Sequence, residues 1–474
     1  MPEGTRTPPR TRRPSGSAAP DNGGDPIFRP LDFRNLTVKN RLFRSSISGR
    51  IDNYDGSGTQ ARVNWEERFA AGGVGAIISA HSPVDVRGRV LPNYAFCDDD
   101  DKIPFWRAVG EACHRHGCAF ILQISHSGRQ QDIPGVENAG KMRIGVGSRT
   151  DAFHGFENRK MTSREIAEVV DQFGQAARRA KEAGLDGVEI HACNGYLFTQ
   201  YLSPAINRRT DAYGGSLRNR ARLLIEVMES VRTSVGDGYH VQVKLTGTDH
   251  NDAMLPWADA GSTIEDTIQV AKWCEEAGAD GIHVSTGGWF PHPFNPPGDF
   301  PVDEILKNYN AMIPFGTHVL RNYLFFRSPL GPLFTRRWNR SRGDRPIEGI
   351  ALEDAARIKA EVGIPVIVAG GFQTASVIRD AIASGQVDGV TMARPLMANP
   401  DLPQQFAAGR ERAERPCSYC NRCLLNVLTN PLGCYDVDRF DGDHDAMMRS
   451  VMAFYRPDGF AERVSEPAAP PAAR

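Results

Sequence analysis

The chain has 474 residues, which is enough for two average domains or for one large α/β barrel with additions. Its 56 Lys and Arg residues balance 57 Asp and Glu residues, which gives a formal net charge of −1. This balance leaves no basic face of the kind that binds nucleic acid, so we expect no nucleic-acid partner. The mean hydropathy is −0.40, and no run approaches the roughly 18 apolar residues of a membrane span, so we expect no such span.

Both ends of the chain have the composition of disordered tails. Residues 1–25 are rich in Pro, Gly, Ser and Arg, and residues 461–474 also contain too few large apolar residues to order themselves. The pair Arg12 and Arg13 lacks the apolar stretch that follows in an export signal. Five of the nine cysteines are scattered, which is typical of reduced thiols. Together these features predict a cytoplasmic protein.

Eight short apolar runs predict β-strands that alternate with helices. In chain order the runs lie at 41–47, 70–80, 118–124, 182–192, 240–246, 276–286, 364–370 and 383–393. The helix before the fourth run begins with a capping box formed by Thr162 and Glu165. Eight such units predict a (β/α)8 TIM barrel. An open doubly wound sheet is the alternative, which is disfavoured because no GxGxxG follows the first strand.

The predicted domain organisation follows from these runs. After the tail at 1–25, the barrel extends over 26–410. The sixth and seventh strands are separated by far more residues than a usual barrel connection, so we expect a long insertion at about 289–350. A Cys-rich C-terminal extension is expected at 411–460, and the second tail at 461–474.

Groups able to contact a ligand follow the end of every predicted strand, where the active sites of such barrels lie. In strand order they are Ser45, Ser46 and Ser48; Ala80 and His81; Gln123, Ser125 and His126; His191, Asn194 and Tyr196; Lys244; Ser285; Gly370 and Gly371; and Arg394. A glycine pair after the seventh strand and a cation after the eighth are typical of a barrel phosphate site. Any one of these residues alone is more often a loop cap, but all eight strand ends together predict a ligand site.

The sequence resembles the Old Yellow Enzyme family, the NADH:flavin oxidoreductases. The segment that carries the resemblance is HACNGYLFTQYLSPAINRRTDAYGGSLRNRARLLIEV, which begins at His191. Further support comes from LTVKNRLFRSSIS at 36–48, LQISHSGRQ at 122–130, VAGGF at 368–372 and MARPLMANPDL at 392–402. The resemblance covers roughly residues 26–435, apart from the insertion, and extends to the barrel of 2,4-dienoyl-CoA reductase-like relatives.

The resemblance implies an FMN bound across the mouth of the barrel. Gln123 would hydrogen-bond the pyrimidine edge of the flavin, and Lys244 would lie near its N1–O2 edge, where the family more often has Arg. Ser48 would lie near flavin O4, where it would tune the redox potential. Backbone contacts would come from Ser46, Ile47 and Ala80. The phosphate would be held at Gly370, Gly371, Ala393 and Arg394.

The resemblance also implies the chemistry. NAD(P)H would reduce the flavin, and the flavin would reduce an activated alkene such as an enone or an enoyl thioester. His191 and Asn194 would grip the oxygen of the electron-withdrawing group and so polarise the double bond. Tyr196 would deliver the proton that completes the reduction. The alternative from the residues alone is a buried structural network of these three side chains.

A second motif with chemical character is a cysteine cluster. Cys417, Cys420, Cys423 and Cys434 have the spacing C-x2-C-x2-C-x10-C. Larger relatives carry a [4Fe–4S] cluster after strand 8, with a slightly longer spacing, and pass electrons to it from a further FAD- and nucleotide-binding portion that we expect this chain to lack. The alternatives are therefore an iron–sulfur cluster, a zinc site or metal-free thiols. If a cluster is present, a separate reductase is a candidate electron donor.

The predicted insertion is rich in arginine. Between 321 and 345 it has seven arginines and one acidic residue, Asp344, with aromatic residues interleaved. We expect a lid beside the flavin that shapes the substrate pocket. The arginines, including Arg336, Arg337 and Arg340, are candidates for binding an NADPH phosphate or a CoA tail, for docking on a membrane surface or a partner, or for a merely solvated surface.

Three functions are compatible with these features. The first is an FMN-dependent ene-reductase that acts on a small-molecule substrate. The second is an FMN-dependent amine demethylase or dehydrogenase that passes electrons through the cysteine cluster, although an amine has no carbonyl oxygen for His191 and Asn194 to grip. The third is a flavoprotein electron-transfer subunit. The sequence leaves open whether the chain forms a homo-oligomer.

Overall fold

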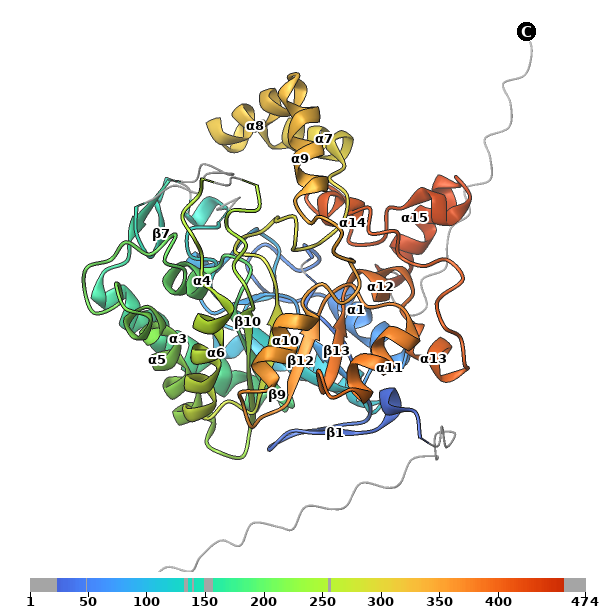
Figure 1. The fold of residues 1–474 in the computed structure, drawn as a ribbon, viewed down its shortest axis with the longest axis horizontal. Coiled ribbons are helices and arrows are strands. Elements are labelled where there is room, and N and C mark those ends of the chain that lie inside the picture. The colour runs from blue at the N-terminus through green and yellow to red at the C-terminus, as the bar shows by residue number, and fades with distance from the viewer. Residues whose placement is uncertain are drawn as a thin grey trace, which may run out of the picture.

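The computed structural model describes residues 24–47, 49–131, 135–138, 140–148, 157–254 and 257–455, apart from the side chain of Phe315. Eight parallel strands form a closed barrel, which confirms the predicted (β/α)8 fold (Figure 1). They are β3 (Leu42–Arg44), β4 (Ala76–Ile78), β6 (Ala119–Ser125), β9 (Gly187–Ala192), β10 (His240–Thr246), β11 (Gly281–Ser285), β12 (Val366–Ala369) and β13 (Gly389–Met392). Seven of these strands fall within the predicted runs, β6 ends one residue beyond its run at 118–124, and the pairing of β4 with β6 closes the barrel. Almost all of both predicted tails, and Ser48, lie outside the described residues.

The helices that follow the strands cover the outside of the barrel. They are α1 (Gln60–Ala71), α2 (Ile103–His114), α3 (Ser163–Glu182), α4 (Leu197–Leu202), α5 (Leu217–Val235), α6 (Ile264–Glu276), α10 (Leu352–Lys359), α11 (Ala375–Ala383), α12 (Arg394–Ala398) and α13 (Leu402–Ala407). The predicted capping box begins α3, because Thr162 Oγ1 accepts from the Glu165 backbone and the Glu165 carboxylate accepts from the Thr162 backbone. Ile166, Val169 and Phe173 then bury one face of this helix against the barrel.

Short strands complete the fold at the two ends of the barrel. β1 (Leu31–Asp32) and β2 (Thr37–Val38) form an antiparallel hairpin whose apolar side chains pack with Phe43 and Ile121 from the barrel strands, at the end opposite the insertion (Figure 1). β5 (Ser82–Pro83) extends the pairing of β6, and β7 (Arg143–Gly145) pairs with β8 (Asn158–Lys160).

The segment between β11 and α10 is the predicted insertion. It contains α7 (Val302–Met312), α8 (Thr317–Arg327) and α9 (Leu330–Arg340), which project from the barrel above α14 (Arg422–Asn426) in Figure 1. These helices have a small core of their own, in which Phe300 packs on Trp338 with their ring centroids 4.7 Å apart. Four leucines on α8 and α9 are more than a third exposed, namely Leu320, Leu324, Leu330 and Leu333.

The C-terminal extension returns to the barrel. α15 (His444–Met452) leads to Phe454, whose ring lies 4.8 Å from that of Trp65 on α1, and Asn64 donates a hydrogen bond to the Phe454 carbonyl. This contact anchors the end of the extension on the first barrel helix. In the ranges described, no helix combines the length and the apolar character needed to cross a membrane.

A buried charge network joins β3 to α1. Glu66 forms ion pairs with Arg44 and, at 3.3 Å, with Arg62, and Arg62 also pairs with Asp52 at 2.7 Å. All four side chains are buried, and burial lowers the pKa of Arg44 to about 9. Glu66 is thus the carboxylate that neutralises two arginines away from water.

Replacing Glu66 by Ala is therefore expected to lower the free energy of unfolding by roughly 3–5 kcal/mol, because two buried guanidinium groups lose their shared partner. Urea-induced unfolding followed by circular dichroism measures this change. The matched control is Glu111→Ala on the exposed side of α2, which should change the free energy by no more than about 0.5 kcal/mol. Equal losses in both variants would contradict a structural role for the network.

Candidate active site

A cavity of about 1150 Å³, including the part open to solvent, lies at the C-terminal ends of the barrel strands. All eight strands or the residues directly after them contribute to its wall. From these strand ends come Ser45, Ser46, Ile47, His81, Gln123, His191, Asn194, Tyr196, Lys244, Ser285, Thr286, Ala369, Gly370, Gly371, Thr391, Ala393 and Arg394.

The cavity brings together nearly all of the residues that the sequence predicts for the site. Three described residues are exceptions, because Ala80, Ser125 and His126 do not line the cavity. Ala80 is buried beside His81, and its carbonyl accepts hydrogen bonds from Ser79 and Ser82. The predicted role of Ser48 falls outside the described residues.

A buried carboxylate forms the floor below this cavity. Glu189, in the middle of β9, accepts hydrogen bonds from Gln123 Nε2 at 2.7 Å and Gln242 Nε2 at 2.5 Å, and contacts His283 Nδ1 at 2.8 Å. Burial opposes its ionisation, but the neighbouring His283 and Lys244 and these hydrogen bonds together lower the pKa of Glu189. The other ring nitrogen of His283 lies 3.0 Å from Thr391 Oγ1 on β13.

This network was not predicted from the sequence, although it has a sequence signal. Glu189 and His191 alternate along β9, as Gln242 and Lys244 alternate along β10. Residues two apart on a strand share a face, so polar residues repeating with this period in apolar strands indicate a polar barrel interior.

Lys244 provides a buried cation at the cavity wall. The strand register places it beside His191 on β9 and His283 on β11. It is 4% exposed, and none of the described residues forms a hydrogen bond or an ion pair with its ammonium group. Its charge favours the ionised form of the nearby Glu189, while the ammonium group, without a hydrogen-bonding partner, suits a ligand that brings an electron-rich or anionic edge.

The two residues predicted to bind the substrate oxygen, His191 and Asn194, lie close together at the cavity wall. Asn194 Nδ2 lies 3.5 Å from His191 Nε2, and Ser125 Oγ lies 3.0 Å from His191 Nδ1. Burial and the nearby Lys244 hold the pKa of His191 well below its usual range, so the ring is neutral. If the Ser125 hydroxyl donates to Nδ1, the imidazole N–H is left on Nε2, so that two N–H donors, His191 Nε2 and Asn194 Nδ2, lie 3.5 Å apart at the cavity wall.

Asn295, from the insertion, orients the Asn194 amide. Its Nδ2 donates to Asn194 Oδ1 at 2.5 Å, which turns the Asn194 nitrogen toward His191. Asn194 itself sits in the left-handed region with φ 60°, and the following Gly195 has φ 77°. Asn295 was missed by sequence reasoning because only the fold brings it to this turn.

Tyr196 stands at the edge of the cavity. Its ring centroid lies 4.8 Å from that of His191 and 5.2 Å from that of His81, and no described residue hydrogen-bonds its hydroxyl. Burial raises the pKa of Tyr196 well above its usual value, so the phenol keeps its proton. It is therefore available as a neutral proton donor to a bound molecule.

The predicted phosphate end lies on the opposite side of the cavity. Gly371 has φ 71°, a conformation that favours glycine, and its carbonyl accepts from Tyr419 at 2.5 Å. Arg394 donates to Asn421 Oδ1 at 2.5 Å, and its guanidinium lies over the Tyr419 ring. The C-terminal extension thus braces the predicted phosphate-binding arginine.

The four clustered cysteines lie next to this end, and Cys423 lines the cavity itself. Burial raises the pKa of Cys417 to about 11, Arg394 lowers it, and Cys434 and Cys420 raise it as charged neighbours. Within the described ranges, no three His, Cys, Asp or Glu side chains are close enough to hold a metal ion.

The arginines of the insertion are distributed over its surface. Arg336, Arg337 and Arg340 are exposed on α9 and do not line the cavity. Arg345 lies over the ring of Phe294, which does line it, with 5.3 Å from the guanidinium carbon to the ring centroid. Their roles in binding an NADPH phosphate or a CoA tail remain predictions.

Known proteins resemble the chain over most of its length. The NADH:flavin oxidoreductase / NADH oxidase family matches residues 26–265. An NADH oxidase from Thermoanaerobacter brockii is 29% identical over 424 residues, which are 86% of this chain and 57% of that protein. An NADPH dehydrogenase from Listeria monocytogenes serotype 4b is 35% identical over 263 residues, which are 55% of this chain and 73% of that protein.

Among solved structures, a complex of 2-naphthoyl-CoA reductase with 2-naphthoyl-CoA superposes with a TM-score of 0.71 and 25% identity. The match covers 89% of this chain and 58% of that chain. The chain therefore spans a little over half the length of both the NADH oxidase and this reductase.

The buried imidazoles predict a loss of stability in acid. Burial lowers the pKa of His81 to about 4 and those of His126 and His292 to about 3, while each has a pKa near 6.5 when unfolded. The contribution of these histidines to the free energy of unfolding is fully present above about pH 6.5. Below that pH it falls by roughly 1.4 kcal/mol per pH unit for each histidine, because only the unfolded chain takes up these protons. Burial raises the pKa of Asp249 to about 6, which offsets the effect of one of them.

Urea unfolding at pH 7.5, 6.5, 5.5 and 4.5 measures this slope. His126→Gln should make the slope shallower, whereas His444→Gln, at an exposed position on α15, should leave it unchanged. A free energy of unfolding that is constant from pH 7.5 to 4.5 would show that the buried rings do not control acid stability.

Proposed function

The chain belongs to the NADH:flavin oxidoreductase / NADH oxidase family, and we propose that it is an FMN-dependent enzyme that uses NAD(P)H to reduce a carbon–carbon double bond conjugated to a carbonyl group. The observation that carries the proposal is the meeting of His191, Asn194 and Tyr196 at the wall of one cavity whose other residues suit a flavin. When bound, FMN would supply the hydride for such a reduction.

The residues present fit FMN. Lys244 offers an unpaired buried cation for the electron-rich edge of the ring system, and Gln123 retains one amide N–H beyond its bond to Glu189. Arg394 stands at the glycine turn, at the end suited to a phosphate. The predicted cofactor-binding residues that line the cavity are Ser46, Ile47, Gln123, Lys244, Gly370, Gly371, Ala393 and Arg394.

His191 and Asn194 would bind the carbonyl oxygen of the substrate. Two N–H donors aimed at one oxygen stabilise the negative charge that develops there when the conjugated double bond is reduced. Both donors are held before substrate arrives, His191 by Ser125 and Asn194 by Asn295, so little reorganisation is needed.

Tyr196 would give a proton to the carbon next to the carbonyl. Its high pKa ensures that the hydroxyl is protonated at neutral pH, and the developing enolate is basic enough to take the proton. The neighbouring rings of His81 and His191 pack against the phenol ring and so limit its orientation.

A second candidate function is electron transfer through the cysteine cluster, as in an amine dehydrogenase or an electron-transfer subunit. The observation in its favour is that Cys423 lines the cavity at the C-terminal ends of the barrel strands, which we call the flavin cavity. We propose that Cys417, Cys420, Cys423 and Cys434 bind an iron–sulfur cluster there, because several irons can each take one thiolate from dispersed cysteines. Anaerobic turnover of a secondary amine, without turnover of an enone, would favour this function.

The proton-donor role of Tyr196 is tested by the Tyr196→Phe variant. Reoxidation of NADPH-reduced flavin by 2-cyclohexenone should slow by roughly 10²–10⁴-fold, because only the hydroxyl is lost. Reduction of the flavin by NADPH should be unchanged. Stopped-flow absorbance measures both steps under anaerobic conditions.

The matched control is Tyr201→Phe, which removes another buried phenol whose hydroxyl contacts the Met161 sulfur instead of the cavity. An unchanged rate of reoxidation in Tyr196→Phe would exclude Tyr196 as the donor. A protein that takes up no FMN would contradict the whole proposal.

The cluster is tested separately by chemical analysis. We expect equal amounts of iron and acid-labile sulfide in anaerobically purified protein, and their loss in Cys423→Ser. Cys274→Ser, at a buried cysteine on α6, should retain both. Absence of iron from the unmodified protein would contradict the cluster and leave a zinc site or metal-free thiols.

A further inference from the structure

A second cavity lies under the helical insertion and adjoins the flavin cavity. We call it the apolar chamber: it has about 1160 Å³, including the part open to solvent, and lies between α7, α14 and the loop that contains Leu91 and Tyr94. It shares Tyr196, Phe290, Pro296 and Leu424 with the flavin cavity. The predicted proton donor therefore stands where the two spaces meet.

The wall of the apolar chamber is hydrophobic and rich in aromatic rings. Phe300 and Trp338 come from the core of the insertion, Tyr94 from the loop after β5, and Tyr309 from α7. Aliphatic side chains fill the spaces between them, including Ile305, Met312, Leu425 and Leu428. Such a wall favours a ligand group that is itself aromatic, because rings gain from offset and edge-to-face packing in addition to burial.

The polar groups on this wall are mostly occupied by the protein. Asn308 donates to the Leu425 carbonyl at 2.6 Å and accepts from Thr429 at 3.0 Å, and Asn421 accepts from Arg394. Gln130 is different: it is buried, and its Nε2 has no partner among the described residues. No Lys or Arg lines the described part of the chamber, and its one charged side chain is Asp299. The chamber therefore disfavours an anionic group.

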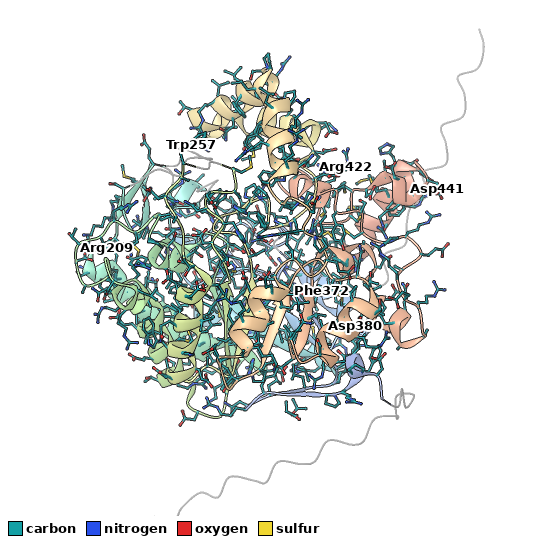
Figure 2. The ribbon with its side chains drawn as sticks, in the orientation of Figure 1. Arg209, Trp257, Phe372, Asp380, Arg422 and Asp441 are labelled. Carbon is teal, nitrogen blue, oxygen red and sulfur yellow. The ribbon has the colours of Figure 1, made fainter. Side chains whose placement is uncertain are left out.

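The chamber is held in place by contacts between its two sides. Arg422 at the start of α14 pairs with Glu304 at 2.8 Å and with Asp303 at 3.1 Å on α7, and Figure 2 shows Arg422 directly below the insertion. Together with the Asn308 bond to Leu425, these contacts fix α7 over α14. A space that is built this way is preformed, which favours binding of a rigid apolar group.

We propose that the apolar chamber binds the apolar remainder of the substrate, and that this remainder is a bulky aromatic group attached to the conjugated carbonyl compound. The proposal rests on the proposed function, because it places the reacting carbonyl at His191 and Asn194. The aromatic group extends past Tyr196 into the chamber, so the enzyme favours large aryl enones over small ones.

Binding of unreactive ketones tests the chamber without any turnover. Isothermal titration of the FMN-loaded protein with 1,3-diphenylpropan-1-one and with cyclohexanone should give a dissociation constant at least tenfold lower for the diaryl ketone. Ile305→Trp, which fills the chamber, should bring the ratio of the two constants close to one. The matched control is Leu333→Trp, an exposed leucine on α9 outside the chamber, which should keep the ratio of the unmodified protein.

If Ile305→Trp does not fold, as judged by circular dichroism, Leu428→Phe on the other wall provides a smaller filling of the same space. Equal affinities for the two ketones in the unmodified protein, or an unchanged ratio in a folded filling variant, would overturn the proposal. A separate stopped-flow measurement with 2-cyclohexenone distinguishes failure of the chamber proposal from failure of the proposed reaction. Reduction of that enone without a preference for the diaryl ketone rejects the chamber alone. Selective ketone binding without reduction of either 2-cyclohexenone or the diaryl enone 1,3-diphenylprop-2-en-1-one supports the chamber and rejects the proposed reaction.

Discussion

The buried carboxylate of Glu189 is the interaction on which the rest of the site depends. A carboxylate inside a barrel costs several kcal/mol unless other groups compensate for its lost hydration. Here Gln123, Gln242 and His283 converge on it from three different strands. The requirement to satisfy one charge thus fixes the positions of β6, β9, β10 and β11 relative to one another, and a fully satisfied network of this kind makes the barrel interior specific and rigid.

The Glu189 network also orients side chains that line the cavity above it. Because Gln123 donates to Glu189, its carbonyl oxygen faces Ser46, which donates to it at 2.8 Å. Lys244 also contributes to stabilising the Glu189 charge while its own ammonium group borders the cavity. With Arg394 after β13 at the far end and a neutral His191 beside Lys244, the cavity has two separate cations. That distribution suits a ligand that carries negative charge at both ends.

The sequence predicted the parts of this site that follow a local rule. The eight strands were found from their apolar runs, and Gln123, His191, Lys244 and Arg394 were found because residues at strand ends meet at one edge of a barrel. The contacts that depend on distant segments were not found. Asn295 lies about a hundred positions from Asn194, and only the folded insertion brings them together. The three helices of that insertion were expected only as a lid, because a long loop has no fixed period from which to predict its contacts.

The two cavities have different origins in the chain, and this difference has an evolutionary consequence. The flavin cavity is formed mainly by the repeated βα units, where a change in one strand disturbs its neighbours. The apolar chamber is formed largely by segments outside the repeat, namely the insertion and the C-terminal extension. Apart from positions such as Asn295 and Asn421, which contact Asn194 and Arg394, substitutions in those segments can accumulate without disturbing the barrel. Selection can therefore change which molecules are accepted while the redox chemistry is retained. A gene that acquires such segments can thus broaden its substrate range without a change in the reaction that it encodes.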